Sequence, residues 1–423
     1  MMTAMTAMTA TTMKKILCPL LMLLLLTTAV FGLSACSENG DDSVTLYVYN
    51  WGEYISDGTE GTLDVNKLFE EWYYENYGVR VEVNYSTYSS NESMYAKLSS
   101  GSVSYDVVVP SDYMIERMIA EDMLAELNFE NIPNIGNLDP AFFGEDATYD
   151  YYDPDNKYAV PYMYGMIGII YNTSMIAADD PSLGSWQLMW DERHTGNILQ
   201  FNNSRDAFGT AQYFLGLDVN SANEAEWRLA LNKLKEQKPI LQGYVMDEIF
   251  NKMENGSAAI AAYYAGDFLS MYENNEDLEF FYPEEGTNLY VDAMCIPKTS
   301  RNKEIAEAYI NFMLSEEPAV ANAEYTYYAS PNTKVRENEE YKAYMNEIKD
   351  GGYDLMYGTE DIPTSSYKNL DSEKLMMLNG LWEELKSDIQ VGLPIYVICG
   401  VILVILIGGG TFLAVRKRIR DKY

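Results

Sequence analysis

Two short turns carry the residue types that could hold a small cation. Residues 49–54 (YNWGEY) follow directly on the strand-like run 44–49, and residues 108–113 (VVPSDY) end a second apolar run. Each turn places a tyrosine and a carboxylate just beyond a strand. Ligands of open α/β sheets bind outside the carboxyl ends of the strands, and aromatic faces combined with carboxylates hold ammonium groups. The two turns therefore predict a cleft for an organic cation.

These turns need a framework of strands and helices that brings them together. The hydrophobic pattern predicts a strand–helix–strand–helix–strand series in residues 44–49, 66–77, 79–85, 91–100 and 105–109. Gly78 and Gly101 are expected to end the two helices. Such a series is typical of a parallel sheet covered by helices. Further strands are expected at 163–171, 258–264 and 290–297, and a further helix at 302–314.

The turns, their spacing and the order of the elements resemble the spermidine/putrescine-binding proteins of ABC importers, over nearly all of residues 44–388. The resemblance implies an α/β type II periplasmic-binding-protein fold, with two lobes that close on a ligand between them. Two lobes also suit the length of the chain, because residues 37–390 are too many for one core. The lobe boundaries implied by the resemblance are 44–157 with 290–325, and 158–289 with 326–388. The acidic stretch 144–157 is expected to be the first crossover.

The resemblance also implies which residues touch the ligand. These are Trp51, Glu53, Tyr54, Ser111 and Tyr113 from one lobe and Asn203, Asp206, Tyr264, Asp267, Asp292 and Tyr328 from the remaining segments. The chain departs from the family at two positions. Asn203 is an amide where the family has an acid, and at the second acidic position Asp206 is the shorter of the two acidic residue types. Tyr264 stands where the putrescine-binding branch has a tryptophan. Residues 89–92 (SSNE) match a family segment too, but a helix N-cap explains them more simply.

These residue types suit a ligand with two protonated amines. Each amine loses its hydration on entering a cleft, so it must find a carboxylate or an aromatic face. A cation over a ring contributes ~0.5 to 2 kcal/mol, and a hydrogen bond to a charged group contributes ~1.5 to 3 kcal/mol. Two amines held in this way could reach micromolar affinity, about −8 kcal/mol, after the entropic cost of binding. Methylenes between the amines would lie against Trp51, Tyr54 and Tyr264.

The composition excludes several classes of partner and cofactor. The chain has a net charge of −35, which disfavours nucleic acid and would steer small cations toward the protein. His194 is the single histidine and lies in a polar stretch, where it is expected at the surface; no metal or cofactor is predicted. Cys295 is the only cysteine of the expected folded region, so an internal disulfide is excluded there.

Both ends of the chain point to a membrane. Lys14 and Lys15 precede the apolar run 16–31 and the tetrad LSAC at 33–36, which predict a signal peptide over 1–35 and a lipid on Cys36. An ordinary cleaved signal is the alternative. Residues 391–415 carry no charge and would span ~37 Å as a helix, more than the ~30 Å of a bilayer core. The basic tail 416–423 is then cytoplasmic and the binding domain lies on the extracellular or periplasmic face.

Three other functions compete with a polyamine receptor. The same fold could bind another organic cation, an amino acid or a sugar, although an amino acid needs a base and only Arg205 lies beside the expected site. Paired carboxylates would permit a surface glycosidase, yet no nucleophile with its base is evident. A structural protein with an idle cleft is the third. The sequence favours a monomeric, non-enzymatic, membrane-anchored receptor that delivers putrescine or spermidine to an ABC permease.

Overall fold

The computed structural model describes residues 43–145, 147–359 and 361–387. The expected signal peptide, Cys36, the apolar segment 391–415 and the basic tail all lie outside these residues. Within the described ranges, none of the helices has the length and apolar character needed to cross a bilayer.

One mixed sheet organises the chain, with strand order β2-β1-β3-β9-β4-β7-β5-β6, while β8 pairs with β4 and β10 with β9. The strands are β1 (Val44–Trp51), β2 (Val81–Tyr88), β3 (Val107–Val108), β4 (Ala159–Asn172), β5 (Ile198–Phe201), β6 (Leu241–Val245), β7 (Ile260–Tyr264), β8 (Leu278–Phe281), β9 (Thr287–Cys295) and β10 (Thr364–Ser365). β1 runs parallel to β2 and β3, as the βαβαβ pattern predicts. The carboxyl ends of β1 and β3 therefore meet at one edge.

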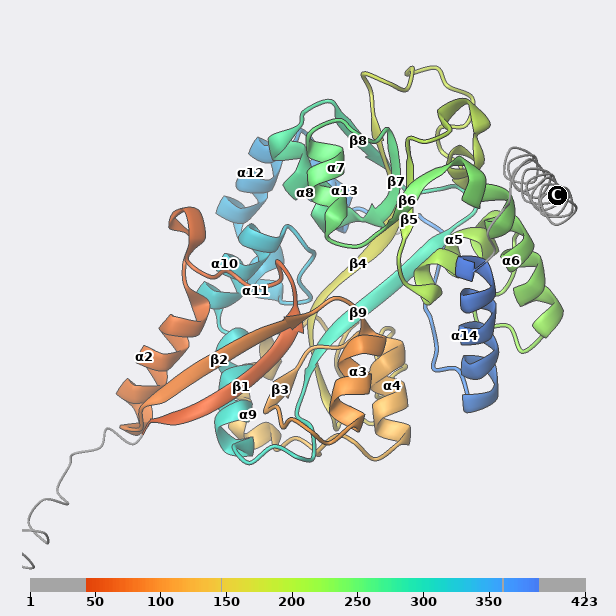
Figure 1. Ribbon diagram of the computed structural model, residues 1–423. Coiled ribbons are helices and arrows are strands. Elements are labelled where there is room, and N and C mark those ends of the chain that lie inside the picture. The colour runs from red at the N-terminus through yellow and green to blue at the C-terminus, as the bar shows by residue number, and fades with distance from the viewer. Residues whose placement is uncertain (1–42, 146, 360, 388–423) are drawn as a thin grey trace, which may run out of the picture.

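Two long strands join the halves of this sheet, as Figure 1 shows. Residues 159–166 of β4 pair with β9, which lies beside β3, and we call this part of the sheet the first half. Residues 167–172 of β4 pair with β7 and β8, and we call that part the second half. β9 likewise reaches β3 through Cys295. The pairing of β4 changes from the first half to the second between residues 166 and 167, shortly after the expected crossover at 144–157. Asp153 of that stretch is buried and accepts hydrogen bonds from Tyr158 and Ala159.

Helices cover both halves. Those packed on the first half are α2 (Val65–Tyr77), α3 (Asn91–Ser99), α4 (Asp112–Ala120) and α9 (Lys303–Met313). The second half carries α5 (Ser204–Phe214), α6 (Glu224–Gln237), α7 (Glu248–Glu254), α8 (Ala265–Asn274) and α14 (Ser372–Ser387). Between them lie α10 (Glu316–Thr326), α11 (Thr333–Arg336), α12 (Glu339–Ile348) and α13 (Gly352–Tyr357). Short 3-10 turns complete the connections.

Most of the expected elements of the first half form close to their predicted bounds. Asp64 caps α2 by accepting from the Lys67 amide at 3.0 Å, and Gly78 ends the helix with φ 67°. Only a glycine adopts this left-handed conformation without strain. β2 begins at Val81 rather than at residue 79, and β3 is only two residues long, although Ser111 beyond it still bridges to Asp292 of β9.

The core is continuous across the two halves. One cluster of buried side chains runs from Leu46 and Phe69 in the first half to Phe201 and Phe268 in the second. A separate cluster between α6 and α14 includes Trp227 and packs the last described helix onto the second half. Each fully buried large apolar side chain contributes about 1.5 to 3 kcal/mol relative to exposure, so the framework around the two turns is firmly held.

Candidate functional site

One pocket contains every residue that the sequence comparison predicted to touch the ligand. Its volume is about 850 Å³, including space open to solvent, and all eleven predicted residues line it: Trp51, Glu53, Tyr54, Ser111, Tyr113, Asn203, Asp206, Tyr264, Asp267, Asp292 and Tyr328. The lining comes from the turns after β1 and β3, from the start of α5 and from the junction of β7 with α8. The pocket therefore draws on both halves of the sheet.

The pocket is acidic. Seven of its lining side chains are carboxylates, namely Glu53, Glu92, Asp112, Asp206, Asp247, Asp267 and Asp292. No lysine, arginine or histidine occurs among the described residues that line it. Closely spaced carboxylates raise one another's pKa and favour a bound cation over an anion. The charges alone exclude a simple anion as the preferred ligand.

Asp292 contributes to the pocket from strand β9. It is 4% exposed on β9, and its Oδ2 accepts a hydrogen bond from the Tyr54 hydroxyl at 2.8 Å. Its Oδ1 has no hydrogen-bond partner among the described residues. Burial raises the pKa of Asp292 to about 6, although the nearby Ser111 and Tyr54 hydroxyls act in the opposite direction. The side chain thus offers a buried acceptor oxygen to the pocket.

Asp206 is held by the start of α5. The Asn203 Oδ1 accepts from the Asp206 amide at 2.8 Å, which makes Asn203 the N-cap. Its Nδ2 donates to Asp206 Oδ2 at 2.6 Å, and the Tyr264 hydroxyl donates to the same oxygen at 2.8 Å. Burial raises the pKa of Asp206, whereas these two donors lower it. Asn203 lines the pocket, but its amide is committed to capping the helix and orienting Asp206.

Asp267 marks another part of the pocket, in the first turn of α8. It keeps part of its surface open to the pocket, yet the surrounding protein raises its pKa to about 8. Burial is the main cause, Asp247 and Glu53 add to it, and the Tyr328 hydroxyl lowers the pKa. Because Asp247 and Glu53 line the same pocket, three carboxylates face a ligand here. A cation would relieve their mutual repulsion.

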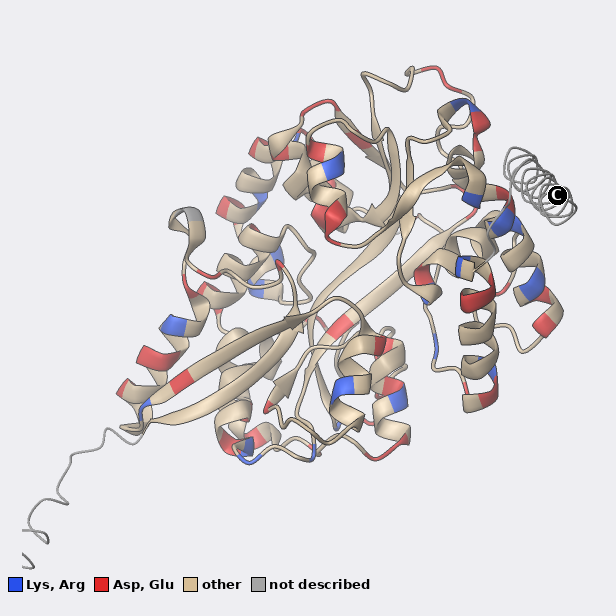
Figure 2. Cartoon of the chain, in the orientation of Figure 1, with Lys and Arg blue, Asp and Glu red and all other residues tan. Residues whose placement is uncertain are grey.

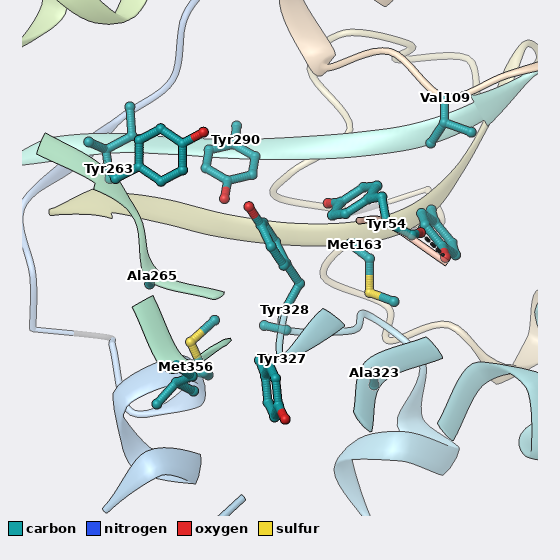
Figure 3. Packing of buried hydrophobic residues seen from close by; sticks show 14 of the residues in the cluster. Tyr54, Val109, Met163, Tyr263, Ala265, Tyr290, Ala323, Tyr327, Tyr328 and Met356 are labelled. Atoms are coloured by element: carbon teal, nitrogen blue, oxygen red, sulfur yellow. Dashed lines mark hydrogen bonds between the residues drawn. The ribbon is translucent and has the colours of Figure 1, made fainter. Parts of the chain in front are cut away.

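Aromatic rings form the walls between the acids. Tyr54 meets Tyr328 edge to face with ring centroids 4.8 Å apart, and Figure 3 shows the hydroxyls of Tyr290 and Tyr328 pointing toward one another. Trp51 is fixed by a 2.9 Å hydrogen bond from its indole nitrogen to the Val109 carbonyl. A Cβ on Gly266 would lie 2.3 Å from the Tyr328 ring, so only glycine permits this ring position. The rings provide apolar slots for methylene groups.

The segment 89–92 has a larger part than the sequence predicted. Ser90 does cap α3, by accepting from the Ser93 amide at 3.2 Å, but all four residues also line the pocket. The Asn91 amide donates to Ser111 Oγ at 3.0 Å and to the Tyr113 hydroxyl at 3.1 Å. Tyr113 in turn donates to Glu92 at 3.0 Å. The expected helix cap is confirmed, and the segment lines the pocket as well.

Gly52 and Asp112 lie in the two predicted turns but were not named as ligand residues, and eight other lining residues were missed: Tyr88, Met246, Asp247, Phe250, Tyr263, Asn288, Tyr290 and Tyr367. Tyr290 could have been found, since it lies two residues before Asp292 and strand alternation puts both on one face. Asp112 lies in the second turn, where its carboxylate accepts from the Tyr151 hydroxyl and the Val291 amide. It therefore joins α4 to β9, and burial raises its pKa to about 7.

Arg205 lies beside the pocket, as expected, but does not line it. It is buried, donates to the Val219 carbonyl at 3.0 Å and stacks 4.5 Å from the ring centre of Tyr367, which lines the pocket. His194 is half-buried rather than fully exposed, with a side chain that is 15% exposed and approaches Asp180. With Asp191 these two residues have the ligand types for a metal. The Arg193 guanidinium already binds both carboxylates.

Two halves joined by long strands, with a pocket drawn from both, define a solute-binding protein. The chain belongs to the bacterial extracellular solute-binding protein family, whose model matches residues 67–348. It is 32% identical over 313 residues to the spermidine/putrescine-binding periplasmic protein of Escherichia coli (strain K12), which covers 74% of this chain and 84% of that relative. The putrescine-binding periplasmic protein PotF of the same organism is 27% identical over 317 residues, covering 70% and 82%.

Solved structures agree with this assignment. A putative spermidine/putrescine ABC transporter from Listeria monocytogenes matches with a TM-score of 0.70 and 34% identity, over 82% of this chain and 99% of that one. PotD, the spermidine/putrescine substrate-binding protein from Streptococcus pneumoniae, matches with a TM-score of 0.63 and 32% identity, over 81% and 99%. The periplasmic-binding-protein-like α/β fold is thereby confirmed. The family binds solutes for ABC transporters, so membership also confirms that the chain is not an enzyme.

Proposed function

We propose that this protein is a polyamine receptor that captures putrescine or spermidine outside the cell and presents it to the permease of an ABC transporter. The observation that carries the proposal is the pocket, in which seven carboxylates and a wall of tyrosines meet without a base among the described lining residues. Such a lining matches a ligand that is cationic at its ends and apolar between them. The relatives named for spermidine and putrescine support the same ligand class.

The carboxylates and the aromatic rings bind different parts of the ligand. Asp292, Asp206 and Asp267 accept hydrogen bonds from ammonium groups, and Glu53 adds charge near Asp267. Trp51, Tyr54, Tyr264 and Tyr328 cover the methylenes and offer ring faces, while Ser111 and Tyr113 complete the wall and Asn203 orients its acid. Charged hydrogen bonds of ~1.5 to 3 kcal/mol each at two amines are enough for micromolar binding, about −8 kcal/mol.

Delivery follows from lobe closure. The lobes that we assign are residues 44–157 with 290–325 and residues 158–289 with 326–388, and β4 and β9 are the strands about which they would rotate. An open form admits the amine and a closed form removes it from water. Because the pocket lining comes from both lobes, the ligand favours the closed form by contacts that only this form completes.

The receptor is placed at the outer or periplasmic face of the cell membrane. The lipobox at 33–36 supports a lipid on Cys36, and the apolar run 391–415 with its basic tail supports a second anchor. Its partners are then the polyamine, the permease subunits and the membrane, with one receptor domain per chain. The net charge of −35, from the excess of Asp and Glu that Figure 2 colours red, is unsuited to nucleic acid.

Ligands that differ only in charge test the proposal. Putrescine has two ammonium groups on four carbons, butylamine has one and 1,4-butanediol has none. We expect the melting temperature of the protein to rise with putrescine, to rise far less with butylamine and to stay unchanged with the diol, since ligand binding stabilises the folded state. Equal shifts with all three would contradict a carboxylate-lined polyamine site. A shift only with a different organic cation would favour the second candidate, a receptor of the same fold for that cation.

A further inference from the structure

Apolar side chains are exposed together at the carboxyl end of α2. Tyr74 is 47% exposed, Tyr77 57% and Val79 39%, and these three residues, which we call the α2 patch, lie within six positions of the chain. The helix buries its opposite face through Val65, Phe69 and other residues of the core. Although Tyr77 packs against the buried Tyr73 ring, much of the surface of the patch stays exposed, and this exposure needs another explanation.

The rings of the patch are held in place. Tyr77 lies 4.5 Å from the buried Tyr73 ring and 6.0 Å from Trp72, and the Arg80 guanidinium lies 4.8 Å above the Tyr74 ring. Side chains that are already ordered lose little conformational entropy when a second surface covers them. A tyrosine also presents an apolar ring and a polar hydroxyl, which suits a boundary between water and an apolar phase.

The patch lies where the chain enters the described structure. The Val44 amide donates to the Arg80 carbonyl at 2.9 Å, and Val44 pairs with Val81 at the start of β1 and β2. This end of the sheet is at the lower left of Figure 1, next to the end of α2. Cys36 precedes Ser43 by seven residues, so it lies within about 25 Å of this point even if the segment is fully extended. Trp51, at the other end of β1, is about 23 Å away and lines the pocket.

The local charge also distinguishes the patch. The chain as a whole carries −35, but residues 74–80 contain one acid, Glu75, and one base, Arg80. Most of the described surface would be repelled by anionic headgroups. Tyrosine is enriched at membrane interfaces, which favours contact of the two rings with the headgroup region.

We propose that the α2 patch rests on the lipid–water interface of the membrane that holds the Cys36 anchor. The proposal rests on the lipid attachment proposed above. A lipid tethers the protein but does not orient it, whereas a rigid aromatic surface beside the tether does both. Contact at the patch stands the first half of the sheet on the membrane and holds the pocket at the far end of β1.

A spin label on the full chain in phosphatidylcholine vesicles without permease tests this contact. The label is placed at Asn76, an exposed residue next to Tyr77 in the last turn of α2, in a chain with Cys295→Ser and Cys399→Ser. A matched label at Leu229, 53% exposed on α6 in the other half, serves as the control. We expect the label at residue 76 to be several-fold less accessible to a water-soluble nickel chelate, and more accessible to oxygen, than the label at residue 229. Equal accessibility at both positions would overturn the proposal.

Two further measurements separate the contribution of the tyrosine rings from that of the lipid on Cys36. Adding Tyr74→Ser and Tyr77→Ser should return the label at residue 76 to water-like accessibility; unchanged protection would overturn the role of the rings. Mass spectrometry reads whether Cys36 carries lipid, and its absence would also overturn the proposal. Putrescine binding is measured on the same vesicles, so that a failure of the patch is distinguished from a failure of the receptor function. If the patch instead docks to the permease, the labels at residues 76 and 229 should be equally accessible in these vesicles, which contain no permease.

Discussion

Asp292→Asn removes one charge from the pocket while it keeps an oxygen that can accept the 2.8 Å hydrogen bond from Tyr54. Losing one partner of a buried charge pair costs ~2 to 5 kcal/mol of binding. At about 1.4 kcal/mol per factor of ten, the Kd for putrescine should rise roughly 30-fold to several thousand-fold. The side chain is 4% exposed and its Oδ1 has no partner among the described residues, so water cannot readily replace it.

The same substitution should not weaken the fold. Burial raises the pKa of Asp292 to about 6 in the folded protein, so its contribution to stability is present below about pH 4 and is lost as the pH rises through 6. At pH 7 the ionised carboxylate therefore opposes folding by up to about 3 kcal/mol, at about 1.4 kcal/mol per pKa unit. The asparagine variant should melt at the same or a higher temperature than the parent in the absence of ligand.

Calorimetric titration with putrescine measures the affinity, and a thermal melt measures the stability. Asp153→Asn is a matched control, because Asp153 is also 4% exposed but does not line the pocket. We expect unchanged affinity in this control. Parental affinity in Asp292→Asn would refute the site assignment, and an equal loss in both variants would mean that the loss reflects general damage to the fold.

Three further predictions concern the rest of the site. Gly266→Ala should weaken putrescine binding by displacing the Tyr328 ring, whereas Gly136→Ala, with nothing near its Cβ, should not; equal affinities would contradict the packing argument. Because the pKa of Asp267 is raised to about 8, amine binding at pH 7 should release protons, and affinity should fall as the pH drops from 8 to 6; titration heats that do not depend on the buffer would contradict this. Asn203→Ala should lower the free energy of unfolding by about 1 kcal/mol through loss of the cap, whereas serine should retain most of it, as urea denaturation can test.

The first half of the site could be predicted from local sequence. Trp51, Glu53, Ser111 and Tyr113 follow strands whose apolar character is plain, and parallel strands bring such turns to one edge. For the second half the physical pattern was insufficient. Asn203 and Asp267 were located by family resemblance, and it was the structure that showed Asn203 to be a helix cap.

The missed residues share a physical reason. Tyr367 reaches the pocket from the segment before α14, and its place depends on the hydrogen bond from its amide to Asn288 and on contact with Gly209. Met246 and Phe250 arrive through α7, whose seven residues have no distinctive pattern. Such positions follow from packing between distant segments, which no local periodicity records. The same holds for the passage between halves, which falls inside the uninterrupted strand β4.

Calorimetric titration of the full chain in nanodiscs with putrescine, cadaverine, spermidine, spermine and a panel of amino acids tests the central claim most directly. We predict micromolar or tighter binding of a diamine or triamine, with one ligand per chain and proton release at pH 7, and no heat with the amino acids. A folded chain that gives no heat with any polyamine, or that binds an amino acid instead, would contradict the account.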